Sequence, residues 1–446
     1  MDRWVSCPQS AKGRSAGEAE RMSKAENRGI VPRLRFPEFR GAGEWDVDQL
    51  SSLADLKNGY AFKSDTYDSS GAYEIVTIAN VQQGNLILDG VRKISVLPRD
   101  IQKHHHIEPG DILISMTGNV GRVCRVLCNG LLLNQRVGKI VPKAVDAGYL
   151  YFTCQSPRFL DTMKLRAAGG AQGNLSANDI LSYEICFPSH KLEQKKIADC
   201  LSSLDELITL EAQKLGALKT HKNGLMQELF PAEGETVPRL RFPEFRGAGG
   251  WDTKQLEEFA VIVRGGSPRP IEAFLTTDHN SLNWLKIGDI DKEAKFITAT
   301  QEKVIPAALS KTRVVYPGDL ILSNSMSFGR PYILKIETCI HDGWIAISEI
   351  HADIDRDYLY YLLMTSNSQE YFSNNAAGSG VQNLNADIIK RLPIPYPGIK
   401  EQQKIADCLS SLDELITAQA KKIESLKTHK KWFMQQLFPV LEETVA

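Results

Sequence analysis

Long apolar runs and paired cysteines are both missing from this sequence. No stretch approaches the roughly 18–20 consecutive apolar residues that a membrane-spanning helix needs, and the first residues lack the apolar centre of a secretory signal peptide. The eight cysteines follow no spacing that would pair them into a disulfide framework, and Cys124 with Cys128 is a lone C-x3-C without a second pair. We therefore expect reduced, partly buried thiols, which favour the cytoplasm as the compartment.

An excess of charge of one sign is missing too. The chain is 42% hydrophobic and 24% charged, and its formal net charge is −1. Bulk positive charge therefore cannot attract nucleic acid, so any such contact depends on local patches or on the surface of a partner. At 446 residues the chain is long enough for two or three domains.

Catalytic signatures are absent as well. The sequence has no G-x4-G-K-[ST] loop, no glycine-rich dinucleotide fingerprint and no H-E-x-x-H, no G-x-S-x-G elbow, and no Asn/Asp-Pro-Pro-Tyr segment of the kind that marks adenine methyltransferases. The run His104-His105-His106 could chelate a metal, but no acidic or cysteine cluster accompanies it, so a solvated or phosphate-facing strand end is favoured. The sequence predicts a reader or scaffold with no catalytic residue and no metal site.

What the chain does have is a helix written twice. Residues 197–209 and 405–417 are identical, and both copies continue to K-T-H-K and end at L-F-P. Apolar residues recur at alternating steps of four and three, which is the period of a coiled-coil seam. The first seam is Ile197, Leu201, Leu204, Ile208, Leu215, Leu218, Leu225 and Leu229, with Glu211 and Lys222 in the two remaining places. The second is Ile405, Leu409, Leu412, Ile416, Ile423, Leu426, Phe433 and Leu437, with Gln419 and Lys430 there.

Each such helix would be roughly 55–60 Å long and would leave an apolar stripe that needs a cover. The other copy is the obvious cover, and the long connection between the copies permits antiparallel pairing within one molecule. Two alternatives stay open: each helix packs on its own domain, or the seams pair between molecules.

A second repeat precedes each globular region. Residues 31–43, VPRLRFPEFRGAG, recur unchanged as residues 237–249, and both copies continue to Trp-Asp. The proline and glycine content favours an extended arm over a helix. We expect aromatic residues to hold each arm to a neighbouring surface, namely Phe36, Phe39 and Trp45 in the first and Phe242, Phe245 and Trp251 in the second.

The chain is therefore arm, variable region and helix, written twice. We assign residues 1–30 to a disordered tail or an upstream mis-start extension, 31–50 to the first arm, 51–190 to the first variable region, 191–231 to the first helix, 232–256 to a linker and the second arm, 257–398 to the second variable region, 399–439 to the second helix and 440–446 to a tail. Met22 begins a plausible shorter start.

The variable regions share a skeleton but little detail. P-G-D-I-L-I-S at 109–115 matches P-G-D-L-I-L-S at 317–323, and both are followed by Gly-Arg. Short β-branched runs at 73–78, 111–115 and 137–141 predict strands, and residues 147–166 predict a helix. Each region is expected to be a mixed α/β globule with its own core, and the fold class is α+β.

Polar, glycine-rich loops carry what recognition chemistry these globules have. Arg, Asn and Gln match the edges of guanine and adenine in the major groove, whereas Lys, Ser and backbone amides suit phosphates. Any one of these loops alone is more often a solvated turn. The candidates in the first region are Lys57, Gly59, Tyr60, Phe62, Lys63, Ser64, Thr117, Asn119, Arg122, Gln135, Arg136, Gln172, Asn174 and Ser176. Those in the second are Arg264, Ser267, Arg269, Asn324, Ser325, Ser327, Arg330, Gln382, Asn383 and Asn385.

Taken together, the doubled arm, the P-G-D-[IL]-[IL]-[IL]-S…G-R core and the N-L…D-I…E-Q-x-K-I-A junction resemble the specificity subunit of type I restriction–modification systems. The resemblance runs from about residue 31 to residue 439. It implies two target recognition domains that each read one half of a bipartite site in double-stranded DNA, with the paired helices as a spacer. The second domain lacks the basic, aromatic segment at 59–64 and has residues 264–269 instead, which leaves its reading residues less defined.

The resemblance also implies partners. Two methyltransferase subunits would bind around the repeats, and two restriction/translocase subunits would join in the full complex. S-adenosylmethionine, and ATP with Mg²⁺, would be bound by those partners, and this chain would need no cofactor. The residues expected to meet the methyltransferase subunits are Arg35, Phe36, Phe39, Glu193, Gln194 and Ile197 in the first repeat and Arg241, Phe242, Phe245, Glu401, Gln402 and Ile405 in the second.

Physical reasoning on the repeats agrees with that picture. Unlike globules predict unlike half-sites about one helical turn (~10 bp) apart, and nearly identical arms and helices predict two equivalent partner surfaces. The alternatives are a coiled-coil adaptor that binds protein and an inactive specificity subunit. A self-sufficient modification enzyme is disfavoured by the missing cofactor motifs.

Overall fold

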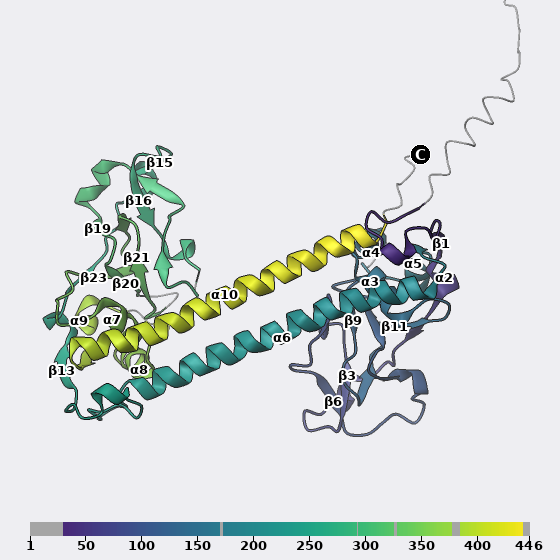
Figure 1. Cartoon of the computed structure of the whole chain (residues 1–446), viewed down its shortest axis with the longest axis horizontal. Helices are drawn as coiled ribbons and strands as arrows, with labels where there is room; N and C mark the ends of the chain where they lie inside the picture. The colour runs from purple at the N-terminus through teal and green to yellow at the C-terminus, as the bar shows by residue number, and fades with distance from the viewer. Residues whose placement is uncertain (1–29, 170–172, 292, 325–327, 377–383, 440–446) are drawn as a thin grey trace, which may run out of the picture. The chain divides into compact units, whose positions relative to one another are not determined.

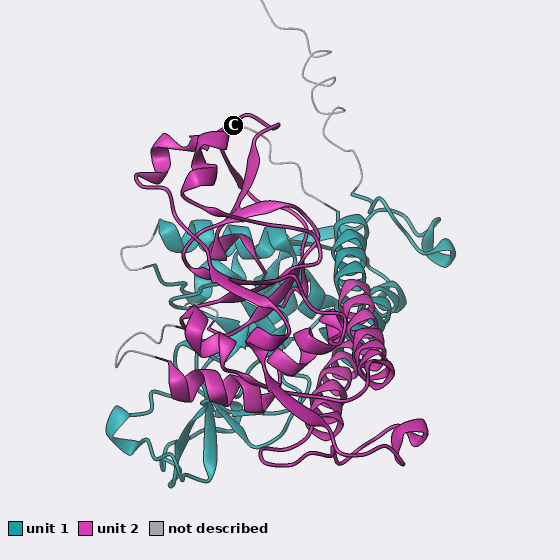
Figure 2. Ribbon diagram, turned by 90° about the vertical axis from the view of Figure 1, so that its left-hand side faces the viewer, with its two compact units in different colours: residues 1–210, 423–446 teal, residues 211–422 magenta. Residues whose placement is uncertain are grey.

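The computed structural model describes residues 30–169, 173–291, 293–324, 328–376 and 384–439. It divides into two units, Met1–Leu210 with Ile423–Ala446, and Glu211–Lys422 (Figure 2). Each unit therefore combines one variable region with parts of both long helices, α6 (Lys191–Leu229) and α10 (Ile399–Leu437). The helices are 39 residues each, as the seam predicts.

The first unit places two four-stranded sheets in layers. Its strands are β1 (Asp46–Gln49), β2 (Ala54–Asn58), β3 (Tyr73–Val76), β4 (Val81–Gln82), β5 (Asn85–Leu86), β6 (Arg92–Ile94), β7 (His106–Ile107), β8 (Ile112–Ser115), β9 (Val123–Arg125), β10 (Leu131–Leu133), β11 (Val137–Pro142) and β12 (Glu184–Phe187). One sheet has the order β2-β11-β8-β9 and the other β6-β3-β10-β7, while β1 pairs with β12 and β4 with β5. Figure 1 labels β9 and β11 of the first sheet and β3 and β6 of the second.

Strand β8 shows how the sequence builds these layers. All four of its residues are buried, and successive side chains of a strand point to opposite faces. Ile112 and Ile114 lie in the core that faces the helices, whereas Leu113 lies in the core between the two sheets. A continuous apolar run is thus what a strand with both faces covered requires.

The short α-helices of the first unit are α2 (Leu50–Leu53), α3 (Ala147–Gln155), α4 (Pro157–Ala168) and α5 (Ala177–Leu181). The prediction of one helix over residues 147–166 is wrong, because the helix is interrupted at Ser156. Proline disfavours helical geometry in the residue before it, and Ser156 is extended, with its side chain accepting from the Phe159 amide as the N-cap of α4.

The second unit repeats this architecture with five-stranded sheets, ordered β14-β23-β20-β21-β17 and β15-β18-β16-β22-β19, and β13 paired with β24. Its strands are β13 (Asp252–Gln255), β14 (Val261–Arg264), β15 (Leu275–Thr276), β16 (Leu282–Leu285), β17 (Phe296–Ile297), β18 (Glu302–Val304), β19 (Arg313–Val315), β20 (Leu320–Ser323), β21 (Pro331–Leu334), β22 (Thr338–Ile340), β23 (Trp344–Ser348) and β24 (Pro393–Tyr396). Its short helices are α7 (Arg356–Leu363), α8 (Ser366–Asn375) and α9 (Ala386–Lys390).

The long helices pair antiparallel, as predicted. Within the second unit, Lys222 bonds Asp413 at 2.6 Å, and Gln419 donates to the side chain of Glu211 at 2.6 Å. Higher numbers on α6 thus meet lower numbers on α10. Within the first unit, Lys430 bonds Asp205 at 2.6 Å, and Met434 and Leu437 of α10 lie in the same core as Ile197 and Leu201 of α6. Every predicted seam residue is buried or half-buried.

Candidate nucleic-acid interface

Four loops of the first unit converge at one end of the β2-β11-β8-β9 sheet. The Gln135 amide donates to the Tyr60 carbonyl at 2.8 Å, the Met116 amide to the Arg136 carbonyl at 3.1 Å, and the Leu175 amide to the Met116 carbonyl at 2.8 Å. We call this group, residues 57–64, 116–119, 134–136 and 173–176, the first loop cluster. Segments far apart in the sequence are therefore held together by backbone bonds, independently of their side chains.

Gly59 makes this convergence possible. A Cβ added there would overlap the backbone carbonyls of Leu133 and Asn134. Only glycine lets two backbones approach so closely. The Tyr60 amide then donates to the Leu133 carbonyl at 2.8 Å. Gly59 is therefore a supporting residue of the cluster, and its predicted contact with DNA stays a prediction.

Several predicted reading residues of the first unit are exposed on this cluster: Lys57, Lys63, Ser64, Asn119, Gln135 and Arg136. They combine two amides with cations, the groups that suit base edges and phosphates. Tyr60 and Thr117 are half-buried, and the Tyr60 hydroxyl donates to Asp100 at 2.7 Å.

Other predicted residues of the first unit have structural roles. Phe62 is buried with Ile75 and Leu132 and is not available to DNA, because an aromatic ring on this loop covers the outer face of a sheet. The Arg122 guanidinium bonds Gln82. Ser176 is the N-cap of α5 and exchanges bonds with Asp179. Asn174 is half-buried and engaged in an interaction, and Gln172 lies outside the described residues.

The second unit has an equivalent cluster on the same backbone frame. The Gly266 amide donates to the Ile340 carbonyl at 3.1 Å, the Asn324 amide to the Gly343 carbonyl at 3.0 Å, and the Leu384 amide to the Asn324 carbonyl at 3.0 Å. A Cβ on Gly265 would overlap the His341 carbonyl, as one on Gly59 would overlap Asn134. We call residues 264–269, 323–324, 341–343 and 384–385 the second loop cluster.

These matching contacts align the two clusters. Gly265 corresponds to Gly59, and His341, Asp342 and Gly343 correspond to Asn134, Gln135 and Arg136. Residues 341–343 were not among the residues predicted from the sequence. The available signal was the order of elements, because both triplets lie between two apolar strands ahead of a Tyr-Leu-Tyr helix.

Asp342 is the centre of the second loop cluster. Its carboxylate accepts from the Ser267 hydroxyl at 2.7 Å and lies 3.5 Å from the Arg269 guanidinium. Its backbone carbonyl accepts from Arg264 at 2.8 Å and from the Asn324 side-chain amide at 2.9 Å. The bond from Ser267, followed by the nearby charges, lowers the pKa of Asp342. Arg264 and Arg269 remain exposed.

Asn324 is therefore a correction to the predicted reading set. Its side chain is 2% exposed and holds the Asp342 loop, so it supports the cluster from inside. Arg330 is half-buried beside the Tyr332 ring, and Asn385 is exposed but serves as the N-cap of α9. Ser325, Ser327, Gln382 and Asn383 lie outside the described residues.

The arms attach to the long helices through buried ion pairs. Arg35 bonds Glu193 in bidentate fashion at 2.7 and 2.8 Å, and Arg241 bonds Glu401 at 2.7 Å through both nitrogens. Each side chain of these pairs is at most 8% exposed. The bond to Glu193, followed by its charge, raises the pKa of Arg35.

The neighbouring glutamines and isoleucines of the junctions are interior as well. Gln194 accepts from the Asp146 amide and donates to the Pro188 carbonyl, both at 2.7 Å, and Gln402 is held in the same way. These findings correct the expectation of direct partner contact for Glu193, Gln194, Ile197, Arg241, Glu401, Gln402 and Ile405, all of which are buried in their own units, and for Arg35, whose side chain is equally enclosed.

The arm residues next to these pairs remain accessible. Phe36, Phe39, Phe242 and Phe245 are half-buried. Lys196 of α6 lies 3.2 Å from Glu38, and Lys404 of α10 lies 3.6 Å from Glu244. In the second unit a cavity of about 550 Å³ opens between the arm and the start of α10, with Arg241, Phe245 and Glu401 among its lining residues.

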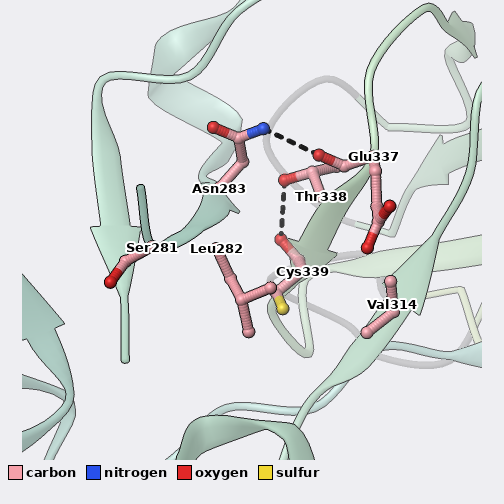
Figure 3. A pocket seen from close by; sticks show the side chains of 7 residues that line it. All are labelled: Ser281, Leu282, Asn283, Val314, Glu337, Thr338 and Cys339. Carbon is pink, nitrogen blue, oxygen red and sulfur yellow. Dashed lines mark hydrogen bonds between the residues drawn. The ribbon is translucent and has the colours of Figure 1, made fainter. Parts of the chain in front are cut away.

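A smaller cavity, of about 190 Å³, lies on the β16-β22-β19 side of the second unit (Figure 3). Asn283 donates across it to the Glu337 carbonyl at 2.7 Å. It gathers no charged side chain other than Glu337, and it is separate from the second loop cluster in its lining residues.

The His104–His106 run has a structural role in part. His105 is buried, its Nδ1 accepts from the Gln102 amide at 3.0 Å, and its ring lies edge-on to Tyr60. Burial lowers the pKa of His105. Among the residues that the structure describes, no group of three or more His, Cys, Asp or Glu side chains could hold a metal ion. None of the described helices is long and apolar enough to cross a membrane.

The family model of the type I restriction modification DNA specificity domain matches residues 42–220 and again 248–428. A Methanocaldococcus jannaschii protein named as the MjaX specificity subunit of a type I restriction enzyme is 24% identical over 88% of this chain and 92% of its own length. The MjaIX specificity subunit of the same organism is 28% identical over 41% of this chain and 44% of its own.

Solved structures share the fold. The crystal structure of the S subunit from M. genitalium superimposes with a TM-score of 0.56 at 17% identity, covering 92% of this chain and all of that one. A chain from a study of assembly and conformational transition of the type I restriction–modification system has a TM-score of 0.56 at 18% identity, covering 89% and 97%. The same domain model matches the chain twice, and each match contains one loop cluster. Together the two matches cover most of the sequence. The chain therefore belongs to the type I restriction–modification specificity subunits, the non-catalytic DNA-recognition subunits of those systems.

Proposed function

We propose that each loop cluster reads one half of a bipartite DNA site. The observation that carries this proposal is the pairing of one backbone frame with two different sets of side chains. The first cluster presents Gln135 and Arg136 where the second presents Asp342 and Gly343. Those groups suit different base edges, so the two half-sites differ and the target is not a palindrome.

The repeated surfaces support two equivalent binding sites for methyltransferase subunits. Thirteen arm residues and thirteen helix residues are identical between the repeats, and many of these side chains point outward. Packing inside the chain cannot account for identity at exposed positions. Exposed identical residues include Arg33, Glu38, Arg40, Asp199, Glu206 and Leu207 with their counterparts Arg239, Glu244, Arg246, Asp407, Glu414 and Leu415.

In this proposal the buried junction residues act indirectly. Glu193 and Glu401 fix the arms against the helices, and the arms then present Phe39 and Phe245 to the partner. Restriction subunits would join through the methyltransferase subunits, and S-adenosylmethionine, ATP and Mg²⁺ would be bound by those partners. The helices would act as the spacer between the half-sites. DNA and these partners meet in the cytoplasm.

The deciding experiment is the adenine methylome of the host, read by long-read sequencing with and without this gene. We expect the loss of one split, non-palindromic motif that is methylated on both strands. Exchanging residues 51–190 for those of an unrelated specificity subunit should then alter one half of the motif alone. An unchanged methylome would contradict the proposal and favour a protein-binding adaptor or an inactive subunit, which a pull-down with the methyltransferase subunit would separate.

A further inference from the structure

Asp342 carries a negative charge, whereas the other exposed charged residues of the second loop cluster are positively charged. The described side chains around it are cationic or neutral, with Arg264 and Arg269 exposed and Ser267 donating to it. A carboxylate on a surface that approaches DNA is repelled by the phosphates. Its presence there needs a reason beyond electrostatic attraction to the duplex.

Part of that reason is structural. The Asp342 carbonyl receives bonds from Arg264 and Asn324, and the Asp342 amide donates to the Ser267 hydroxyl at 3.2 Å. These bonds use the backbone of Asp342, however, and would form with another residue in its place. Among the described residues, the contacts that use the carboxylate are the Ser267 hydroxyl bond at 2.7 Å, the long Arg269 contact at 3.5 Å and His341 Nδ1 at 3.7 Å from Oδ1.

The carboxylate retains acceptor capacity. Two carboxylate oxygens offer about four lone-pair sites, and Ser267 takes one of them, on Oδ1. Within the described part of the chain, Oδ2 has only the Arg269 contact, from a guanidinium that is 82% exposed. The Asp342 side chain is itself 41% exposed. One oxygen is therefore held in position by Ser267, and the other is open to a donor from outside.

The equivalent residue of the first loop cluster carries an amide in place of the carboxylate. Gln135 occupies the same backbone position and is exposed. An amide both donates and accepts and suits adenine, whereas a carboxylate only accepts. Among the four bases, cytosine presents an amino donor without a neighbouring acceptor in the major groove.

We propose that Asp342 is a specificity-determining residue, whose open carboxylate oxygen accepts a hydrogen bond from the N4 amino group of a cytosine in the half-site of the second domain. Ser267 orients the carboxylate for that contact, and Arg269 offsets its repulsion from the phosphates. This inference rests on the proposed function and adds the identity of one base and the residue that reads it.

The test uses the full chain assembled with its methyltransferase subunits. The DNA probes are two libraries, each with one half-site randomised and the other kept, and bound or methylated molecules are sequenced from both. The variant is Asp342→Asn, which keeps the shape and can still accept from Ser267. We expect the preference for cytosine at one base pair to fall by about tenfold or more, with the other positions of the second half-site unchanged.

Two further variants sharpen the result. Ser267→Ala frees the carboxylate to rotate, and we expect it to weaken the same single preference by a smaller factor. Gln135→Glu, in the first cluster, should shift a preference in the first half-site only. Because the first half-site is read by the same molecules, its unchanged selection by Asp342→Asn shows that the chain is folded and assembled.

Other outcomes would overturn the inference. If Asp342→Asn lowers binding to all second half-sites evenly, or leaves the selected sequences unchanged, Asp342 only holds the loop. If the wild-type complex selects no split site at all, the proposed function itself fails, and the inference fails with it. The wild-type selection therefore distinguishes the two failures.

Discussion

At the scale of single residues, the Arg35–Glu193 and Arg241–Glu401 pairs carry the clearest energetic consequence. Removing one member of a buried ion pair leaves an uncompensated charge in the interior, which is far more costly than exchanging the whole pair for apolar groups. Glu193 also accepts from the Trp45 indole at 3.3 Å. Loss of the guanidinium would therefore leave a 1% exposed carboxylate with one weaker donor.

We expect Arg35→Met to lower the local unfolding free energy of the first unit by about 3 kcal/mol. Hydrogen exchange of the β1 amides, which pair with β12, measures the opening of that part of the unit. Arg241→Met is the matched variant and should act on β13 and β24 instead. The double variant Arg35→Met with Glu193→Gln should recover part of the loss. A change of only a few tenths of a kcal/mol for Arg35→Met would contradict this account.

Residue roles were the least predictable part of the sequence. Polar, glycine-rich composition located most of the loops, because such segments disfavour regular elements, and Gln135 and Arg136 are exposed as a reading surface needs. Lys57 is exposed as well, but it lies in strand β2. Composition does not reveal which loop packs over which other loop in the folded protein. Asn324 is buried because residues 341–343 lie over it, and Asp342 was missed because its segment shares no local sequence with its counterpart.

At the scale of elements, the helix pair depends on charged residues within its seam. Lys222 and Asp413 are 16% and 26% exposed and 2.6 Å apart, and the Tyr361 hydroxyl donates to the other oxygen of Asp413 at 2.6 Å. The corresponding pair in the first unit is Lys430 with Asp205. Each pair contains one of the two lysines, Lys222 or Lys430, that interrupt the apolar seams.

We expect Lys222→Glu to weaken the helix pair in the second unit by about 2 kcal/mol, because it sets a second carboxylate against a half-enclosed Asp413. The exchange Lys222→Glu with Asp413→Lys should restore most of the loss. Hydrogen exchange along α6 and α10 measures both variants. Lys427→Glu is the control, since Lys427 and its partner Glu424 are 55% and 72% exposed and pairs of that kind contribute little. Equal effects at Lys222 and Lys427 would refute a role for the seam pair.

The elements themselves were predicted well where one period dominates. A seam of alternating fours and threes has only one regular solution, so the length of the long helices followed from the sequence, and their antiparallel pairing was the favoured one of three arrangements. The break at Ser156 was missed because apolar residues resume at Phe159, and the signal was the pair Ser156-Pro157, a capping residue followed by proline. The number of strands in each sheet depends on pairings between distant segments that no local pattern contains.

At the scale of the whole molecule, the two copies of the repeated helix contact each other at equivalent positions. Glu211 and Gln419 are separated by 208 residues, which is the offset between the two helix copies, and they bond directly across the helix pair. The contact therefore lies at the same position along each of the two helices. Lengthening both helices by the same amount at this place keeps every seam contact in step.

This geometry gives the sharpest test of the helices as a spacer. Duplicating residues 208–214 and 416–422 adds one heptad to each helix, or roughly 10.5 Å at ~1.5 Å per residue. That length corresponds to about three base pairs at ~3.4 Å each. We expect the variant to leave both half-sites unchanged and to replace the original gap with one about three base pairs longer, as read from the methylome.

The control duplicates the heptad in one helix only, which puts the two seams out of step. Methylation should then be lost at both spacings, although each half-site is still encoded by an intact domain. Methylation of the original spacing by the doubly lengthened chain would rule out the helices as the measuring element. The gap would then have to be set by the partner subunits or by the bending of the DNA between the half-sites.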